Sequence, residues 1–160
     1  MWLEEQWQIA LALRSEEGPA LLPLYPSHSS RASKPKIIVQ NNALITAITD
    51  RSFDETAHNR DRIGRLAENA VGAHLLNTLH PSEYRVSYFR ERVRGRDLEV
   101  DFVVTRGDAV VALEVTKAES HSRAGIEAFK QQVPSARAII VGPGGIRLAD
   151  FLSTNPQQFL

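Results

Sequence analysis

Three acidic residues lie in apolar segments of this 160-residue chain, where an isolated charge is unexpected. Glu68 belongs to a segment with helical periodicity, whereas Asp101 and Glu114 lie inside the segments 97–105 and 109–116, whose alternation is typical of strands. Burying a carboxylate costs free energy unless the group is paired or bound to a cation. These three residues are therefore the first candidates for chemistry.

Asp101 and Glu114 should lie close together. The turn at Arg106-Gly107-Asp108 joins their segments as a hairpin, which brings the two carboxylates close to a cross-strand pair. Carboxylates at that distance repel each other, and Mg²⁺ or Mn²⁺, which bind carboxylate oxygens, would relieve the repulsion. We therefore expect a metal site with Asp101 and Glu114 as ligands. The alternative is a solvated strand face on which both acids are ordinary surface residues.

A basic segment precedes these strands. It carries arginines at alternate positions, Arg90, Arg92, Arg94 and Arg96, preceded by Arg85 and the aromatic residues Tyr84, Tyr88 and Phe89. Basic and aromatic side chains beside a hairpin turn suit a nucleic-acid backbone, so the arginines from 90 to 96 are candidate contacts to DNA or RNA. The alternative is that the acidic neighbours Glu91, Asp97 and Glu99 neutralise the segment, which is then merely solvated.

The elements that must position these residues follow in order from residue 62. Periodicity predicts a helix over 62–79, strands over 84–89, 97–105 and 109–116, a helix over 122–133, a strand over 136–141 and a short helix over 148–152. The strand over 136–141 is nearly all apolar, which predicts an interior position. Alternation over 97–105 predicts that Val100 and Phe102 share one face, and Glu99 and Asp101 the other. These elements predict an α/β fold.

The first 61 residues follow a less regular pattern. We expect a helix over 2–14, a linker rich in proline and serine over 26–36, a strand and a short helix over 37–49, and a loop over 50–61. The predicted division is an N-terminal segment, 1–61, and an α/β domain, 62–160. Segment 1–61 does not contain enough regular elements for a domain of its own, which favours a remnant of a longer protein.

Composition excludes several classes of protein. The chain has no cysteine, which rules out a disulfide scaffold, a thiol nucleophile and a cysteine zinc site. Its 19 basic and 19 acidic residues balance, which argues against a uniformly basic nucleic-acid clamp. Apolar runs fall short of the roughly 18 residues of a membrane span, and no signal peptide is recognisable, so we expect a cytoplasmic protein without membrane contacts. No Walker A motif occurs, so no nucleotide site is expected.

Three motifs together carry a family resemblance. GRLAENAV at 64–71, LEVDFVV at 98–104 and ALEVTK at 112–117, in this order of elements, resemble the PD-(D/E)XK nuclease superfamily. More narrowly, they resemble the uncharacterised C-terminal domain of bacterial and archaeal AAA-type ATPases, and KPKIIVQNNALITAI at 34–48 resembles the segment that leads into it. The resemblance spans roughly 20–152. It implies a restriction-endonuclease-like core of helix, three strands, helix and strand, in which a mixed four-stranded sheet is flanked by helices.

The resemblance also implies roles for residues. Asp101 and Glu114 match the two metal-binding acids, and Glu68 matches a helix glutamate that often completes the site. The motif lysine is replaced by Thr116. Lys117 comes one residue later, and strand alternation places its side chain on the opposite face. It completes the catalytic set only if a bulge turns it to the same face as the acids. Lys130 on the next helix is the alternative source of the ammonium.

Two functions follow from this altered motif. The retained acids favour an active magnesium- or manganese-dependent DNA or RNA nuclease. The missing lysine favours a degenerate accessory domain of an AAA-type ATPase, which keeps a vestigial metal site and binds nucleic acid or a protein partner. That partner would be an ATPase domain or a second copy of the chain. We expect the degenerate accessory domain.

Overall fold

The computed structural model describes residues 10–13, 36–49, 52–117 and 123–160. In chain order the elements are β1 (Ala10–Leu13), β2 (Lys36–Val39), α1 (Asn42–Thr49), α2 (Phe53–Ala57), α3 (Arg60–Thr78), β3 (Arg85–Val93), β4 (Arg96–Arg106), β5 (Ala109–Val115), α4 (Ala124–Gln132), β6 (Arg137–Val141), α5 (Leu148–Ser153) and a 3₁₀ turn (Pro156–Gln158). From α3 onward they match the predicted elements closely. No helix of the described residues is long and apolar enough to cross a membrane.

A mixed four-stranded sheet forms the centre of the molecule, which confirms the predicted α/β class. Its strand order is β3-β4-β5-β6, with antiparallel pairs except for the parallel pair β5 and β6. The prediction of an interior strand over 136–141 is wrong, because β6 lies at the edge of this sheet. Its buried side chains, Ile139 and Val141, pack among residues of the flanking helices, so helix cover accounts for its apolar sequence.

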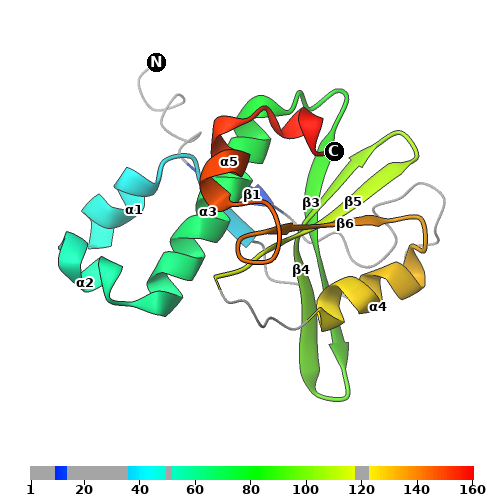
Figure 1. The fold of residues 1–160 in the computed structure, drawn as a ribbon, viewed down its shortest axis with the longest axis horizontal. Helices are drawn as coiled ribbons and strands as arrows, with labels where there is room; N and C mark the ends of the chain where they lie inside the picture. The colour runs from blue at the N-terminus through cyan, green and yellow to red at the C-terminus, as the bar shows by residue number, and fades with distance from the viewer. Residues whose placement is uncertain (1–9, 14–35, 50–51, 118–122) are drawn as a thin grey trace.

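Helices cover both faces of the sheet (Figure 1). α3 and α5 pack on one face, where the buried residues include Val71 and Leu75 of α3 and Phe151 of α5. α4 packs on the other face through Ile126 and Phe129. Burial of apolar side chains on both faces supplies the main driving force for this arrangement.

α3 approaches the sheet and β2 closely. Asn59 caps its first turn by accepting a hydrogen bond from the Arg62 amide, which fixes the start of the helix. Gly72 then faces Ile38 of β2 and Phe102 of β4, and a Cβ atom at this position would lie 2.9 Å from each of them. The missing side chain at Gly72 therefore lets three elements meet at one point.

An irregularity in β4 changes which side chains share a face. Between the pairs Ser87–Val103 and Phe89–Val100, β4 advances three residues while β3 advances two, so β4 contains a bulge. Val100 therefore packs with α4, whereas Phe102 packs on the α3 face. The predicted grouping of Val100 with Phe102 is wrong for this reason.

The N-terminal region differs most from expectation. Residues 10–13 form β1, which pairs with β2, so the predicted helix over 2–14 is wrong at these positions. The remainder of that segment and the linker up to residue 35 lie outside the described residues. The predicted strand and helix over 37–49 are confirmed as β2 and α1. The predicted loop over 50–61 contains α2, which Ser52 and Glu55 start with a capping box.

Candidate functional site

Acidic residues from two elements meet beside the N-terminal half of α3. Glu68 of α3 and Glu99 and Asp101 of β4 each offer a carboxylate oxygen, and these oxygens lie within 4.8 Å of one another. The bulge in β4 accounts for the meeting, because it lets Asp101 share the α3 face with Phe102. Glu99 enters the site although sequence reasoning treats it only as a neutralising neighbour of the arginines.

Lys36 of β2 lies in the middle of this acidic cluster. Its Nζ atom is 2.6 Å from Glu68 Oε1, 3.1 Å from Glu99 Oε1 and 3.5 Å from Asp101 Oδ1. The ammonium also donates to the Asp101 carbonyl oxygen at 3.2 Å and lies over the rings of Tyr88 and Phe102. Only 12% of the side chain is exposed. Sequence reasoning missed Lys36 because it stands in a separate segment, 32 positions before Glu68.

Asp101 and Glu114 come together as the hairpin predicts. The β4–β5 ladder ends at the pair Phe102–Leu113, and the two acids are the next residues along each strand. Asp101 Oδ2 accepts a hydrogen bond from the Val115 amide at 2.8 Å. Asp101 is therefore held across the strand pair by a backbone amide of β5.

Both carboxyl groups are shifted toward their protonated forms. Burial, with the charges of Glu68 and Glu99, raises the pKa of Asp101 to about 6, against the opposing effect of Lys36. Burial, followed by the charge of Asp101, raises the pKa of Glu114 to about 7. Glu114 Oε2 is buried and has no hydrogen-bond partner among the described residues. Among the fully buried side-chain polar atoms of the described residues, this oxygen is the one left without a partner.

The site is short of positive charge. Among the described residues, the ion pairs of the four carboxylates Glu68, Glu99, Asp101 and Glu114 come from two cations, Lys36 and Arg90, and Arg90 pairs only with Glu99 of the four, at 2.6 Å. A hard divalent cation takes oxygen ligands from carboxylates, and its charge would favour the ionised forms of Asp101 and Glu114. The donor set and the unsatisfied Glu114 oxygen fit such an ion.

A pocket of about 420 Å³ opens beside Glu68. Its lining comes from the first half of α3 and the end of β5: Asp61, Gly64, Arg65, Ala67, Glu68, Val115, Thr116 and Lys117. Lys117 lines this pocket, but its ammonium donates to Asp61 Oδ1 at 2.9 Å and to the Arg60 carbonyl. The bulge lies in β4, so it does not bring Lys117 toward the acids.

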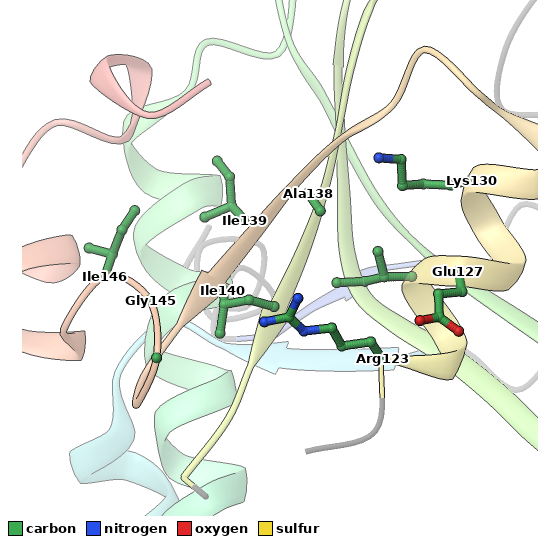
Figure 2. A pocket seen from close by; sticks show the side chains of 10 residues that line it. Arg123, Glu127, Lys130, Ala138, Ile139, Ile140, Gly145 and Ile146 are labelled. Atoms are coloured by element: carbon green, nitrogen blue, oxygen red, sulfur yellow. The ribbon is translucent and has the colours of Figure 1, made fainter. Parts of the chain in front are cut away.

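The alternative ammonium, Lys130, lies elsewhere. It is exposed on α4, on the other face of the sheet, and lines a larger pocket of about 550 Å³ between α4 and β6. Figure 2 shows Glu127 and Lys130 on α4, with Arg123 just before the helix, opposite Ala138 and Ile140 of β6. None of the acidic-site residues lines this pocket, so the substitution of Lys130 for the motif lysine is wrong.

The arginines occupy the β3–β4 hairpin, which extends past α4 (Figure 1). Arg90 binds Glu99 and so connects the hairpin to the acidic site. Arg92 lies 3.9 Å from Asp97, with 76% of its side chain exposed. Arg94 and Arg96 are exposed at the turn, and no ion pair holds either of them within the described part of the chain. The hairpin therefore presents positive charge to solvent on the same strand that carries the half-buried acids Glu99 and Asp101.

Comparison with known families gives one match. Residues 63–151 match the family described as Domain of unknown function (DUF4143). The chain belongs to this family. The match runs from α3 to α5 and so contains Glu68, Asp101 and Glu114 but not Lys36. No curated protein and no solved structure matches the chain.

Proposed function

We propose that this DUF4143 domain is a divalent-cation-dependent phosphodiesterase of the PD-(D/E)XK type that acts on DNA or RNA. The observation that carries the proposal is the buried, unpartnered Glu114 Oε2 beside Asp101, in a site with more carboxylates than cations. The order of helix, three antiparallel strands, helix and parallel strand supports a restriction-endonuclease-like core. The acids lie on the two central strands, at the end of their shared ladder.

Four residues of the site would take part in the reaction. Asp101 and Glu114 would hold the metal ion, and Glu68 would support it from α3. A bound ion of this kind lowers the pKa of a coordinated water and stabilises negative charge on the phosphate. Thr116 stands where the motif has its lysine, so the ammonium would have to come from another residue. Lys36 of β2 would provide it, because its Nζ lies 3.5 Å from Asp101 Oδ1. An electrostatic donor of this type contributes about 10²–10³ in rate.

The arginine hairpin gives the substrate a second contact. Asp101 lies five residue steps after Arg96, a span of about 17 Å along β4. Arg94 and Arg96 would therefore contact backbone phosphates away from the scissile bond and set the position of the strand without reading its bases. Arg90 would stay with Glu99 at the border of the site.

The test is cleavage of single- and double-stranded DNA and RNA with Mg²⁺ or Mn²⁺. Asp101→Asn and Glu114→Gln should each reduce the rate about 10³-fold or more, and Lys36→Met about 10²–10³-fold. Asp108→Asn is the matched control, because Asp108 is an exposed acid in the β4–β5 turn, outside the site. Metal-dependent cleavage that survives Asp101→Asn would contradict the proposal, and so would the absence of any cleavage.

A second function is favoured by the position of Lys36. Its ammonium lies between Glu68, Glu99 and Asp101, where it supplies the positive charge that a metal ion would otherwise supply. In addition, Thr116 stands at the position of the motif lysine. Such a site suits a degenerate accessory domain of an AAA-type ATPase, which binds nucleic acid or a protein partner without cleavage. Titration with Mn²⁺ separates the two: binding by the native chain supports the phosphodiesterase, whereas binding gained only in Lys36→Met supports the degenerate domain.

A further inference from the structure

Asn69, the neighbour of Glu68 on α3, has unusual contacts for a helix residue. It is 7% exposed, and its carboxamide meets both backbone groups of Val39. The Val39 amide donates to Asn69 Oδ1 at 2.8 Å, and Asn69 Nδ2 donates to the Val39 carbonyl at 2.7 Å. Asn69 therefore binds the end of β2 with the donor and acceptor pair that a neighbouring strand would offer.

The same carboxamide makes a third hydrogen bond. Asn69 Nδ2 donates to Asn42 Oδ1 at 2.8 Å, and Asn42 Nδ2 in turn donates to the Leu66 carbonyl at 2.9 Å. Asn42 is the first residue of α1. The buried amide thus connects α3 to the end of β2 and to the start of the following helix, and both of its Nδ2 donor positions are used.

β2 depends on these contacts for its place beside the acids. Within the described residues it pairs only with β1 and does not join the four-stranded sheet. Its contacts with the rest of the domain include Ile38, which packs against Gly72 and Phe102, the Asn69 bonds at Val39, and the Lys36 ammonium itself. Since Lys36 and Val39 are the two ends of one four-residue strand, a bond at one end restricts the other.

We propose that Asn69 is a positioning residue that fixes β2 against α3 and thereby holds the Lys36 ammonium among Glu68, Glu99 and Asp101. Adjacent residues of α3 then hold the two ends of β2: Glu68 binds the side chain of Lys36, and Asn69 binds the backbone of Val39. The functional meaning of this arrangement depends on the proposed role of Lys36, but the positioning itself can be tested separately.

The chemistry at position 69 is specific. The site requires one acceptor and two donors on a short side chain, which asparagine supplies. Aspartate keeps the acceptor for the Val39 amide but loses both donors and places a charge next to Glu68. Alanine loses all three bonds. We therefore expect Asn69→Asp and Asn69→Ala both to release β2.

The experiment is competitive acetylation of lysines in the folded chain, with modified sites quantified by mass spectrometry. In the native chain Lys36 should react at least about tenfold more slowly than the exposed Lys130, which serves as an internal reference. Asn69→Ala should bring the Lys36 rate close to that of Lys130. Val133→Ala, which removes a buried side chain on the α4 face, is the control for general destabilisation and should leave Lys36 protected.

Two results would overturn the inference: protection of Lys36 in folded Asn69→Ala, or equal loss of protection in Val133→Ala. If Asn69→Ala does not fold, Asn42→Ala removes one of the three bonds to Asn69 and should give an intermediate Lys36 rate; an unchanged rate overturns the inference. The labelling does not require cleavage, so it separates failure of this inference from failure of the proposed nuclease function. If cleavage occurs, Asn69→Ala should add no further loss to Lys36→Met.

Discussion

Two stretches of β4 carry charges of similar type in opposite environments. At the hairpin end, Asp97 lies 3.9 Å from Arg92, and their side chains are 61% and 76% exposed. Further along, Asp101 lies 3.5 Å from Lys36, and these side chains are 17% and 12% exposed. Water and salt screen the first pair, so it contributes little, whereas the second pair acts in a medium of lower polarity.

Position along the strand decides the electrostatics of these charges more than residue type does. At the hairpin end Arg92 and Asp97 are mostly exposed, so their charges keep much of their hydration. At the site end, α3 and β2 cover the strand, and the bulge lets Asp101 share the covered face with Phe102. The acids there lose water, which raises the pKa of Asp101 to about 6 and that of Glu114 to about 7.

Lys36→Met should have the largest effect on stability. It leaves Glu68, Glu99 and Asp101 without their shared cation. Removing one partner of a fully buried ion pair costs about 3–5 kcal/mol, so we expect a loss of about 3 kcal/mol or less from this half-buried cluster. Urea unfolding at pH 8 measures this loss. At pH 5 the loss should be smaller, because Asp101 and Glu114 are then mostly protonated.

Arg92→Met is the matched change at the hairpin end of the strand. It removes a cation of an exposed pair and should alter the free energy of unfolding by less than about 0.5 kcal/mol. Equal losses in Lys36→Met and Arg92→Met would contradict the contrast between the two ends of β4.

Glu114→Gln should have the next largest effect on the free energy of unfolding. At high pH it should stabilise the protein, whereas Lys36→Met destabilises it. The pKa of Glu114 is raised from 4.5 to about 7 by folding, so the folded protein binds a proton more readily than the unfolded chain between these values. Stability therefore falls as pH rises from about 4.5 through 7. Glutamine cannot ionise, so the variant should be more stable than the native chain at pH 8, by about 1–3 kcal/mol.

Unfolding curves from pH 4 to pH 9 test this prediction. The native chain and Asp108→Asn should both lose stability across the interval, and Glu114→Gln should give a flatter profile. A gain in stability that is the same at pH 4 and pH 8 would point to packing and against relief of a buried charge.

Local pattern predicts much of this architecture. The periodicity of α3 and the alternation of β4 and β5 identify these elements because one face of each is buried. The turn at Gly107 fixes the register of the hairpin, so Asp101 and Glu114 can be placed together without a structure. These features depend on residues close in sequence, and sequence reasoning recovers them.

The rest depends on tertiary contacts that no local pattern encodes. The bulge in β4 occurs at Asp101 and Phe102, with no glycine to signal it, and it alone changes the face of Val100. Lys36 reaches the acids because β2 packs closely on α3, through the Asn69 hydrogen bond to Val39 and the close approach of Ile38 to Gly72. These contacts join residues that are 30 or more positions apart in the sequence. β6 has the composition of an interior strand because helices cover its apolar side chains.

The smallest effect on stability is expected at the hairpin turn. There the informative measurement is nucleic-acid binding. Arg94→Gln and Arg96→Gln should each change the free energy of unfolding by less than about 0.5 kcal/mol, because both side chains are exposed. If they contact phosphates, each change should weaken nucleic-acid binding and reduce the slope of log affinity against log salt by about one.

Fluorescence anisotropy with labelled single-stranded DNA and RNA at several salt concentrations measures that slope, in the Asp101→Asn background to prevent cleavage. Arg147→Gln is the matched control, because Arg147 is an exposed arginine held by Asp150 at the start of α5. A slope that changes equally in the Arg147 variant would mean that net charge alone governs binding. An unchanged slope in all three arginine variants would show that the hairpin is a solvated surface that does not contact phosphates. The two ends of β4 would then differ in function as well as in burial, with the candidate site at one end and an inactive turn at the other.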